Sequence, residues 1–166
     1  MRTLIAALLM VMLPVAGLDA ADEVISYEKL RAYLPENISG YQRKGDSDGA
    51  TFSSGDMHYS SAEQTYVKGD SVLTVVIADY ASFAIMFEQS TSMWNSSFAV
   101  ETPEQKAGSI DLGGYKGWEV IDKTVFSVEV VAAKQQRFLV TLSEENQTDT
   151  AHLKPVAKAI LDKLPE

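Results

Sequence analysis

The chain has 166 residues, a formal net charge of −9 at pH 7 and no cysteine. This length suits a single domain with one hydrophobic core. The acidic charge disfavours nucleic-acid binding, because phosphate backbones are repelled, and it favours a basic protein partner. The absence of cysteine excludes disulfides, a thiol nucleophile and a lipid anchor attached to a thiol.

The N-terminal stretch has the features of a secretory signal peptide. Arg2 precedes an apolar run at residues 4–15 that is too short to span a membrane, and small residues follow as far as Ala20. We expect cleavage after Ala20, so that 1–20 is a signal peptide and 21–166 is a single domain without stable membrane insertion. An exported domain without disulfides is typical of a Gram-negative periplasm, with an extracellular location as the alternative.

The first part of the mature chain predicts a short helix followed by strands. Apolar spacing favours a helix over 27–33, and Pro35 ends it because the residue before proline avoids the helical region. Residues 37–49 are rich in Gly and Asp and are expected to form a loop or a weak strand. A possible first strand covers 51–57, and a more polar strand covers 56–68.

Residues 72–80 form an almost unbroken run of apolar and β-branched side chains. Such a run is typical of a strand that is covered on both faces, so we expect this strand at the centre of a sheet. Gly69 and Asp70 suit the tight turn of an antiparallel hairpin with the preceding strand.

Apolar residues recur at helical spacing after Ala81, which predicts an amphipathic helix over 81–98. Its stripe comprises Phe83, Met86, Phe87, Ser90, Met93, Trp94, Ser97 and Phe98. The opposite face is polar and almost uncharged, so it is either an ordinary polar surface or a face that contacts something other than bulk water. The candidate partner contacts on that face are Glu88, Gln89, Ser92 and Asn95.

Glycine and proline at 100–114 predict a long connection, of the kind that is often functional or mobile. Three strands follow at 115–121, 125–131 and 137–142, and their spacing indicates an antiparallel meander. Apolar spacing over 150–164 predicts a helix that docks on the sheet.

Tyr115 and Trp118 lie in a glycine-rich segment that leads into a strand. That position argues against a phosphate-binding loop, which opens a helix. The two aromatic side chains are either core residues or exposed anchors of a binding surface, and they join the candidate partner contacts.

These segments predict an α+β fold, in which a mostly antiparallel sheet of about six strands packs with an N-terminal, a middle and a C-terminal helix as an α/β sandwich. The Leu34 and Pro35 pair closes the first helix, and Tyr41 lies in the segment that follows. With the later order of hairpin, helix, meander and helix, the chain resembles the MOG1/PsbP-like arrangement. The resemblance covers most of the mature chain and implies that fold and a non-enzymatic, partner-binding role, without identifying a site residue.

The residues that could carry catalysis or bind a metal ion are few. His58 and His152 suit acid–base catalysis near neutral pH, but the motifs of hydrolases, NTPases and dinucleotide-binding proteins are absent. Asp56, His58 and Glu63 could begin a metal site, and the acidic turn at 46–48 lacks the later ligands of a calcium loop. We therefore predict no catalytic residue, no metal ion and no cofactor.

The sequence favours an exported periplasmic binding protein without catalytic activity. It would act as an inhibitor or immunity-type partner of a basic protein, or as an accessory subunit of an envelope complex. Two alternatives stay open: a carrier of a small molecule or lipid, with a pocket between the 83–98 helix and the sheet, and an enzyme that uses His58. The sequence leaves open the partner, the oligomeric state and the role of the 99–114 segment.

Overall fold

The computed structural model describes residues 23–166 apart from 56, 82, 96 and 97. The expected signal peptide at 1–20 therefore lies outside the described residues. Within the described part of the chain, no helix has the length and apolar character needed to cross a membrane.

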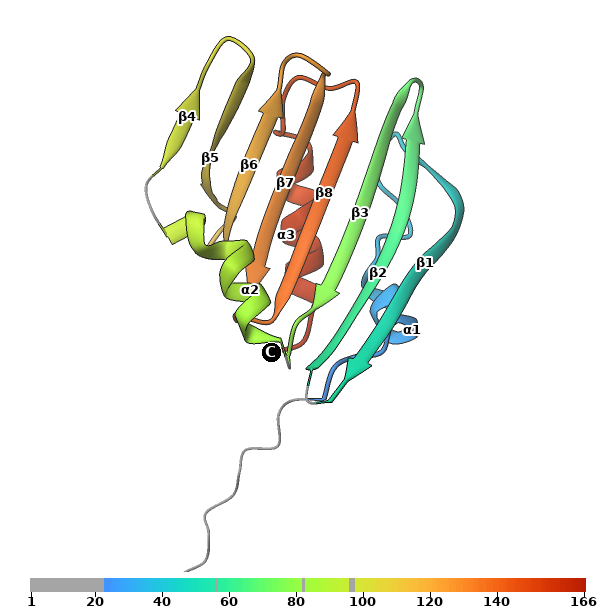
Figure 1. The fold of residues 1–166 in the computed structure, drawn as a ribbon. Helices are drawn as coiled ribbons and strands as arrows, with labels where there is room; N and C mark the ends of the chain where they lie inside the picture. Colours follow the sequence, from blue (N-terminus) through green and yellow to red (C-terminus); the bar gives the residue numbers. More distant parts are fainter. Residues whose placement is uncertain (1–22, 56, 82, 96–97) are drawn as a thin grey trace, which may run out of the picture.

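Eight strands of the described chain form one sheet in which every neighbouring pair is antiparallel (Figure 1). They are β1 (Gln42–Ser54), β2 (Met57–Lys68), β3 (Ser71–Asp79), β4 (Ala99–Glu101), β5 (Gln105–Asp111), β6 (Lys116–Asp122), β7 (Ser127–Lys134) and β8 (Phe138–Glu145). Their order across the sheet is β1-β2-β3-β8-β7-β6-β5-β4. The chain therefore crosses from β3 to the far edge and returns through a meander that places β8 beside β3.

Helices cover the two faces of this sheet unequally. They are α1 (Tyr27–Leu30) with the 3-10 turn η1 (Arg31–Tyr33), α2 (Ala84–Thr91) with the 3-10 turn η2 (Ser92–Asn95), and α3 (Leu153–Lys163). α1 and α3 pack on one face, which we call the inner face, and α2 lies over one end of the opposite, outer face (Figure 1). The described elements leave the rest of the outer face uncovered. The architecture is thus the expected α+β class, with the helices divided between two faces.

Strand residues that point inward form the main core. In β3, the inward residues Leu73, Val75 and Ile77 are fully buried, whereas the outward residues between them are half-buried. The expectation of a strand covered on both faces is therefore wrong: its β-branched outward residues lie on a half-open face rather than under a second layer. The expected docking helix is confirmed as α3, because its apolar residues are buried at helical spacing on the inner face.

The first strand, β1, is longer than the sequence predicts, because it begins at Gln42 rather than at 51. The glycine- and aspartate-rich stretch forms a bulge, in which the pairing with β2 shifts between Lys44 and Asp48 and Gly45 has a φ of 71°. A bulge accommodates extra residues and positive φ without ending the strand. The strand alternative for 37–49 therefore holds from Gln42 onward, and the turn-forming residues mark an irregularity inside β1.

The sheet has eight strands rather than about six because the 100–114 connection, which we expected to be a loop, contains β5 and most of β4. Pro103 lies between these two strands, and Gly113 and Gly114 have positive φ in the turn after β5. Glycine and proline thus mark two turns of a meander, and the prediction of one long loop is wrong.

The middle helix is shorter than the predicted 81–98 segment and continues as a 3-10 turn from Ser92. Among the described residues of the predicted stripe, Phe87 and Trp94 are buried, and they form a second, small core with Ala78 and Leu139 on the outer face. A 3-10 turn has fewer residues per turn than an α-helix, so the stripe no longer shares one face. The exposed large apolar side chains of this region are Ile85, Met86, Met93 and Phe98.

Charged side chains fasten α3 to the inner face at both of its ends. Lys134 of β7 is buried, and its Nζ donates to two carbonyl oxygens at the C-terminal end of α3, at 3.2 and 2.7 Å. A cation at this end of a helix satisfies free carbonyls and complements the helix dipole. At the other end, Lys154 Nζ lies 2.8 Å from Glu119 Oε2 of β6, and Thr150 donates a hydrogen bond to the same oxygen.

The Glu119 contacts lead to a prediction about acid stability. Burial acts to raise the pKa of Glu119, but the hydrogen bonds from Lys154 and Thr150 outweigh it and hold the pKa below its ordinary value of 4.5. A carboxyl with a lowered pKa in the native state stabilises the fold above pH 4.5, and this contribution is lost as the pH falls through the lowered value.

We expect Glu119→Gln to flatten the pH dependence of the free energy of unfolding between about pH 5 and pH 3. Urea denaturation across this range measures the effect. Lys154→Met removes the same stabilisation of the carboxylate and is expected to flatten the curve as well. Curves that run parallel to that of the wild type would show that this ion pair contributes nothing to acid sensitivity.

Candidate binding surface

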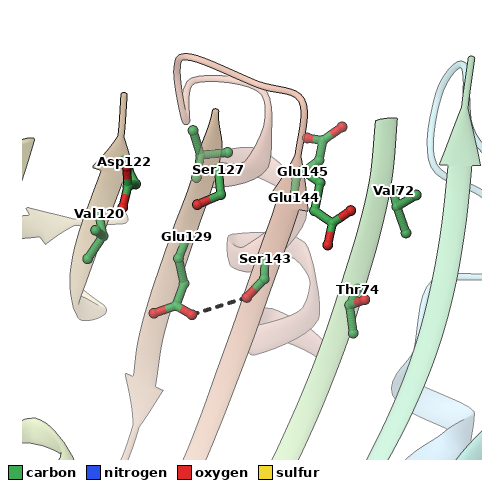
Figure 2. Close-up of a pocket in the computed structure, with 10 residues that line it drawn as sticks. Val72, Thr74, Val120, Asp122, Ser127, Glu129, Ser143, Glu144 and Glu145 are labelled. Carbon is green, nitrogen blue, oxygen red and sulfur yellow. Dashed lines mark hydrogen bonds between the residues drawn. The ribbon is translucent and has the colours of Figure 1, made fainter. Parts of the chain in front are cut away.

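The open part of the outer face contains a shallow hollow with a volume of about 370 Å³. β3, β6, β7 and β8 line it, at the end of the sheet away from α2 (Figures 1 and 2). Its outward side chains include the apolar Val72 and Val120, the hydroxyl group of Thr74, and the carboxylates Asp122, Glu129 and Glu145. The surface therefore combines apolar contact area with negative charge.

The three carboxylates come from three neighbouring strands, β6, β7 and β8. They lie on one surface because each occupies an outward position on its strand (Figure 2). Glu145 is exposed, and Glu129 accepts a hydrogen bond from Ser143 Oγ at 3.1 Å. Hydrogen bonds from the Thr124 hydroxyl and the Thr124 backbone N–H hold the pKa of Asp122 below its ordinary value. Asp122 therefore keeps its negative charge at lower pH than an ordinary aspartate does.

The outward positions of β2, β3, β7 and β8 carry Glu63, Glu129 and Glu145 and no Lys, Arg or His. Cations occur around this group of strands: Lys123 follows Asp122 in the β6–β7 turn, and its Nζ donates to the carbonyl of Thr102 at 3.1 Å. Lys44 is on the edge strand β1, and Lys116 is at the α2 end of β6. An acidic centre of this kind attracts a basic partner during encounter.

The turn between β6 and β7 lies beside the hollow and exposes two large apolar side chains. Val125 is 64% exposed and Phe126 is 54% exposed. Asp122 Oδ1 accepts hydrogen bonds from the backbone N–H of Thr124, at 2.8 Å, and of Val125, at 3.3 Å. Phe126 has a φ of 53°, and its carbonyl accepts a hydrogen bond from Gln147 N at 2.9 Å. The turn is thus held in one shape while its apolar tip faces solvent.

The candidate contacts on the middle helix are exposed at Glu88, Gln89 and Ser92. Asn95 lies in η2, and its side chain is outside the described part of the structure. These polar residues lie at the α2 end of the outer face, whereas the acidic hollow lies at the opposite end (Figure 1).

Tyr115 and Trp118 lie on opposite faces of the sheet. Trp118 is half-buried on the outer face, where its ring stacks on Phe98 with centroids 6.3 Å apart and planes inclined by 9°. Tyr115 packs against the main core, and Lys158 Nζ of α3 lies 5.8 Å from its ring centroid. The two aromatic residues therefore do not form one patch.

A second hollow lies between the middle helix and the sheet, with a volume of about 340 Å³. Phe87 and Trp94 form an apolar wall, and Lys116, Gln135 and Gln136 supply polar groups. This hollow is the place that the sequence predicts for a small ligand.

The two histidines lie at opposite ends of the sheet. His58, at the start of β2, has Nδ1 3.0 Å from Ser53 Oγ, whereas His152 contacts Glu144 at the end of β8. Glu63 points outward and His58 inward, because their positions on the strand differ by an odd number. Asp56 lies outside the described residues, and the described residues contain no group of three or more His, Asp or Glu side chains suited to a metal ion.

The acidic turn at 46–48 lies in the bulge of β1, where Asp48 Oδ1 accepts a hydrogen bond from the backbone N–H of Gly49 at 2.7 Å. Ser47 accepts one from Arg31 Nε at 2.6 Å. These contacts are those of a structured bulge.

Sequence reasoning missed Asp122, Glu129 and Glu145, although a signal for Glu129 exists. In 127–131, Ser127 and Glu129 alternate with inward-pointing valines, so alternation alone places Glu129 outward. The exposed tip at Val125 and Phe126 carries no such signal, since apolar residues in a strand-rich sequence indicate core.

Comparison with known proteins shows similarity of fold alone. No protein-family model matches the chain, and no curated protein sequence matches it. Among solved structures, the extracellular domain of PknH from Mycobacterium tuberculosis is similar, with a TM-score of 0.55 and 12% sequence identity. The alignment covers 85% of this chain and 97% of that domain, so the resemblance extends over most of the described sheet and helices.

Proposed function

We propose that this chain is an exported, non-catalytic binding protein that holds a basic protein against the acidic part of its outer face. The observation that supports the proposal is the uncovered outer face itself, with Glu63, Glu129 and Glu145 at outward positions and apolar side chains between them. A net charge of −9 speeds encounter with a basic partner, and the apolar area then supplies contact that excludes water.

This proposal places the protein in a periplasm, or alternatively outside the cell. In either location it acts as an inhibitor or immunity-type partner, or as an accessory subunit of an envelope complex. The apolar segment at 4–15 and the absence of cysteine support export into such a compartment.

The experiment compares two double variants that change the net charge by the same amount. Glu129→Lys with Glu145→Lys reverses charge on the outer face. Glu28→Lys with Glu36→Lys reverses charge at exposed positions on the side of α1. Chemical cross-linking in the cell envelope and mass spectrometry identify the bound protein, and titration of the purified pair then gives the affinity.

We expect the outer-face double variant to bind about tenfold or more weakly, and the α1-side variant to bind nearly as the wild type does. The wild-type affinity is also expected to fall as salt increases, because exposed charges are screened. Equal losses for the two double variants, or a bound protein that is acidic, would contradict the proposal.

The hollow beneath the middle helix favours a second candidate function, a carrier of a small molecule. Phe87 and Trp94 could contact an apolar part of the ligand, while Lys116 could pair with an anionic group. Native mass spectrometry of the protein purified from its own compartment tests this candidate. A bound small molecule that is lost in Trp94→Ala is the expected result, and a ligand-free wild-type spectrum would contradict it.

A further inference from the structure

The turn between β6 and β7 differs in composition from an ordinary hairpin turn. Hairpin turns are generally polar, yet this one presents a valine and a phenylalanine to solvent at 64% and 54% exposure. Large apolar side chains clustered at an exposed site are typical of interaction surfaces.

The backbone conformation of Phe126 is a second, separate observation. Its φ of 53° lies in the left-handed region, which bulky residues adopt at a cost. The other described non-glycine residues with positive φ are Gln135, Gln136 and Asn146, all polar residues of turns. Asparagine would relax this position, and Phe126 belongs to neither of the two hydrophobic cores of the described residues. Packing in the two cores therefore does not explain why a phenylalanine occupies this strained position.

The tip is joined directly to the acidic hollow. Asp122, whose carboxylate fixes the turn, lines the hollow, and so does Ser127, which follows Phe126 in the chain. Glu129 and Glu145 lie on the same outer face (Figure 2). A partner that receives the tip is thus brought against carboxylates at the same time.

We infer that Val125 and Phe126 form a wedge that enters an apolar pocket on a basic protein, with the basic rim of that pocket against the carboxylates of the hollow. This inference rests on the proposed function and specifies how the partner is recognised. A second copy of this chain fits less well, because its own outer face is acidic and like charges repel. An anionic lipid surface is repelled for the same reason.

The first experiment places the photo-reactive amino acid p-benzoylphenylalanine at position 126 in cells that export the full chain. A second strain carries it at position 85, where Ile85 is 68% exposed on α2. Irradiation and mass spectrometry are expected to identify a basic protein attached at position 126 and not at position 85. Attachment to a second copy, to lipid, or equally from both positions would overturn the inference.

The second experiment measures the affinity of the identified protein for single variants. Phe126→Asn keeps the backbone conformation and removes the ring, so we expect binding to weaken about 30-fold or more while the unfolding temperature stays equal or rises. Gln136→Asn also places asparagine at a residue with positive φ, here 54°, and this variant is expected to bind as the wild type does. Ile85→Ser removes an exposed apolar side chain elsewhere and is also expected to bind normally.

The outcomes separate this inference from the proposed function. If Phe126→Asn binds normally while the double variant at Glu129 and Glu145 binds weakly, the proposed function stands and the wedge is wrong. If no basic protein attaches at position 126 and none binds the wild type, both are wrong.

Discussion

Replacement of Arg137 by leucine is expected to lower the free energy of unfolding by about 3–5 kcal/mol, because it leaves a buried carboxylate without its cation. Asp79 is fully buried at the end of β3. Arg137 donates to it from Nε, at 2.9 Å, and from a terminal guanidinium nitrogen, at 2.9 Å. Urea denaturation with the same probe for wild type and variant measures the loss.

The Asp79 carboxylate also organises the chain around it, which adds to the expected loss. It accepts hydrogen bonds from the backbone N–H of Ile25, at 2.8 Å, and of Ala81, at 3.0 Å. Arg137 in turn donates to the carbonyl of Glu23 at 3.0 Å. The pair therefore ties the N-terminal segment and the start of the α2 connection to the sheet.

The control for Arg137→Leu is Lys158→Leu, which breaks the exposed ion pair between Lys158 and Asp162 on α3. Exposed pairs contribute little, so this variant is expected to unfold nearly as the wild type does. The double variant Asp79→Leu with Arg137→Leu is expected to recover part of the loss, because no unpaired charge stays buried. Equal effects of the Arg137 and Lys158 substitutions would show that burial of Asp79 is not costly.

Leu161→Ala is expected to destabilise the fold by about 3–5 kcal/mol, since it opens a cavity in the main core. Leu161 is fully buried in the core that α3 forms with the inner face of the sheet. The backbone around it is fixed by Lys134, which donates to the Leu161 carbonyl at 3.2 Å, so collapse into the cavity is restricted. Thermal and urea denaturation measure the change.

Ile85→Ala provides the matched control, because it removes a large apolar side chain from a helix position that is 68% exposed. We expect a change within about 0.5 kcal/mol, as alanine also favours the helix. If the two substitutions had similar effects, α3 would not be packed as the structure shows.

The parts of the fold that could be predicted are those where a single sequence pattern determines the secondary structure. Strand alternation places β7 and β8, and helical spacing over many residues places α3. The start of β1 and the pair β4 and β5 were not predictable in this way. There, glycine, aspartate and proline signal turns, but the structure uses them for a bulge and for turns between short strands.

The candidate binding surface also has features that could be predicted from the sequence and one that could not. Tyr115 and Trp118 are three residues apart, and an odd separation puts side chains on opposite faces of an extended segment, so their separation was predictable. The acidic outer face was accessible through alternation in β7 at Glu129. The wedge at Val125 and Phe126 was not, because a positive φ at phenylalanine depends on hydrogen bonds made by Asp122 and Gln147 across the turn.

The placement of β8 beside β3 has a consequence for how the polypeptide reaches its native state. These two central strands pair Val72 with Glu145 and Asp79 with Phe138, although four other strands lie between them in the sequence. Because β8 is synthesised last among the strands, the edge of β3 that pairs with it lacks a neighbouring strand while β4 to β7 are made. Long-range pairing of this kind is slow, and until it forms the unpaired edge of β3 can pair with another chain. The nascent chain is therefore most prone to aggregate before β8 has been synthesised.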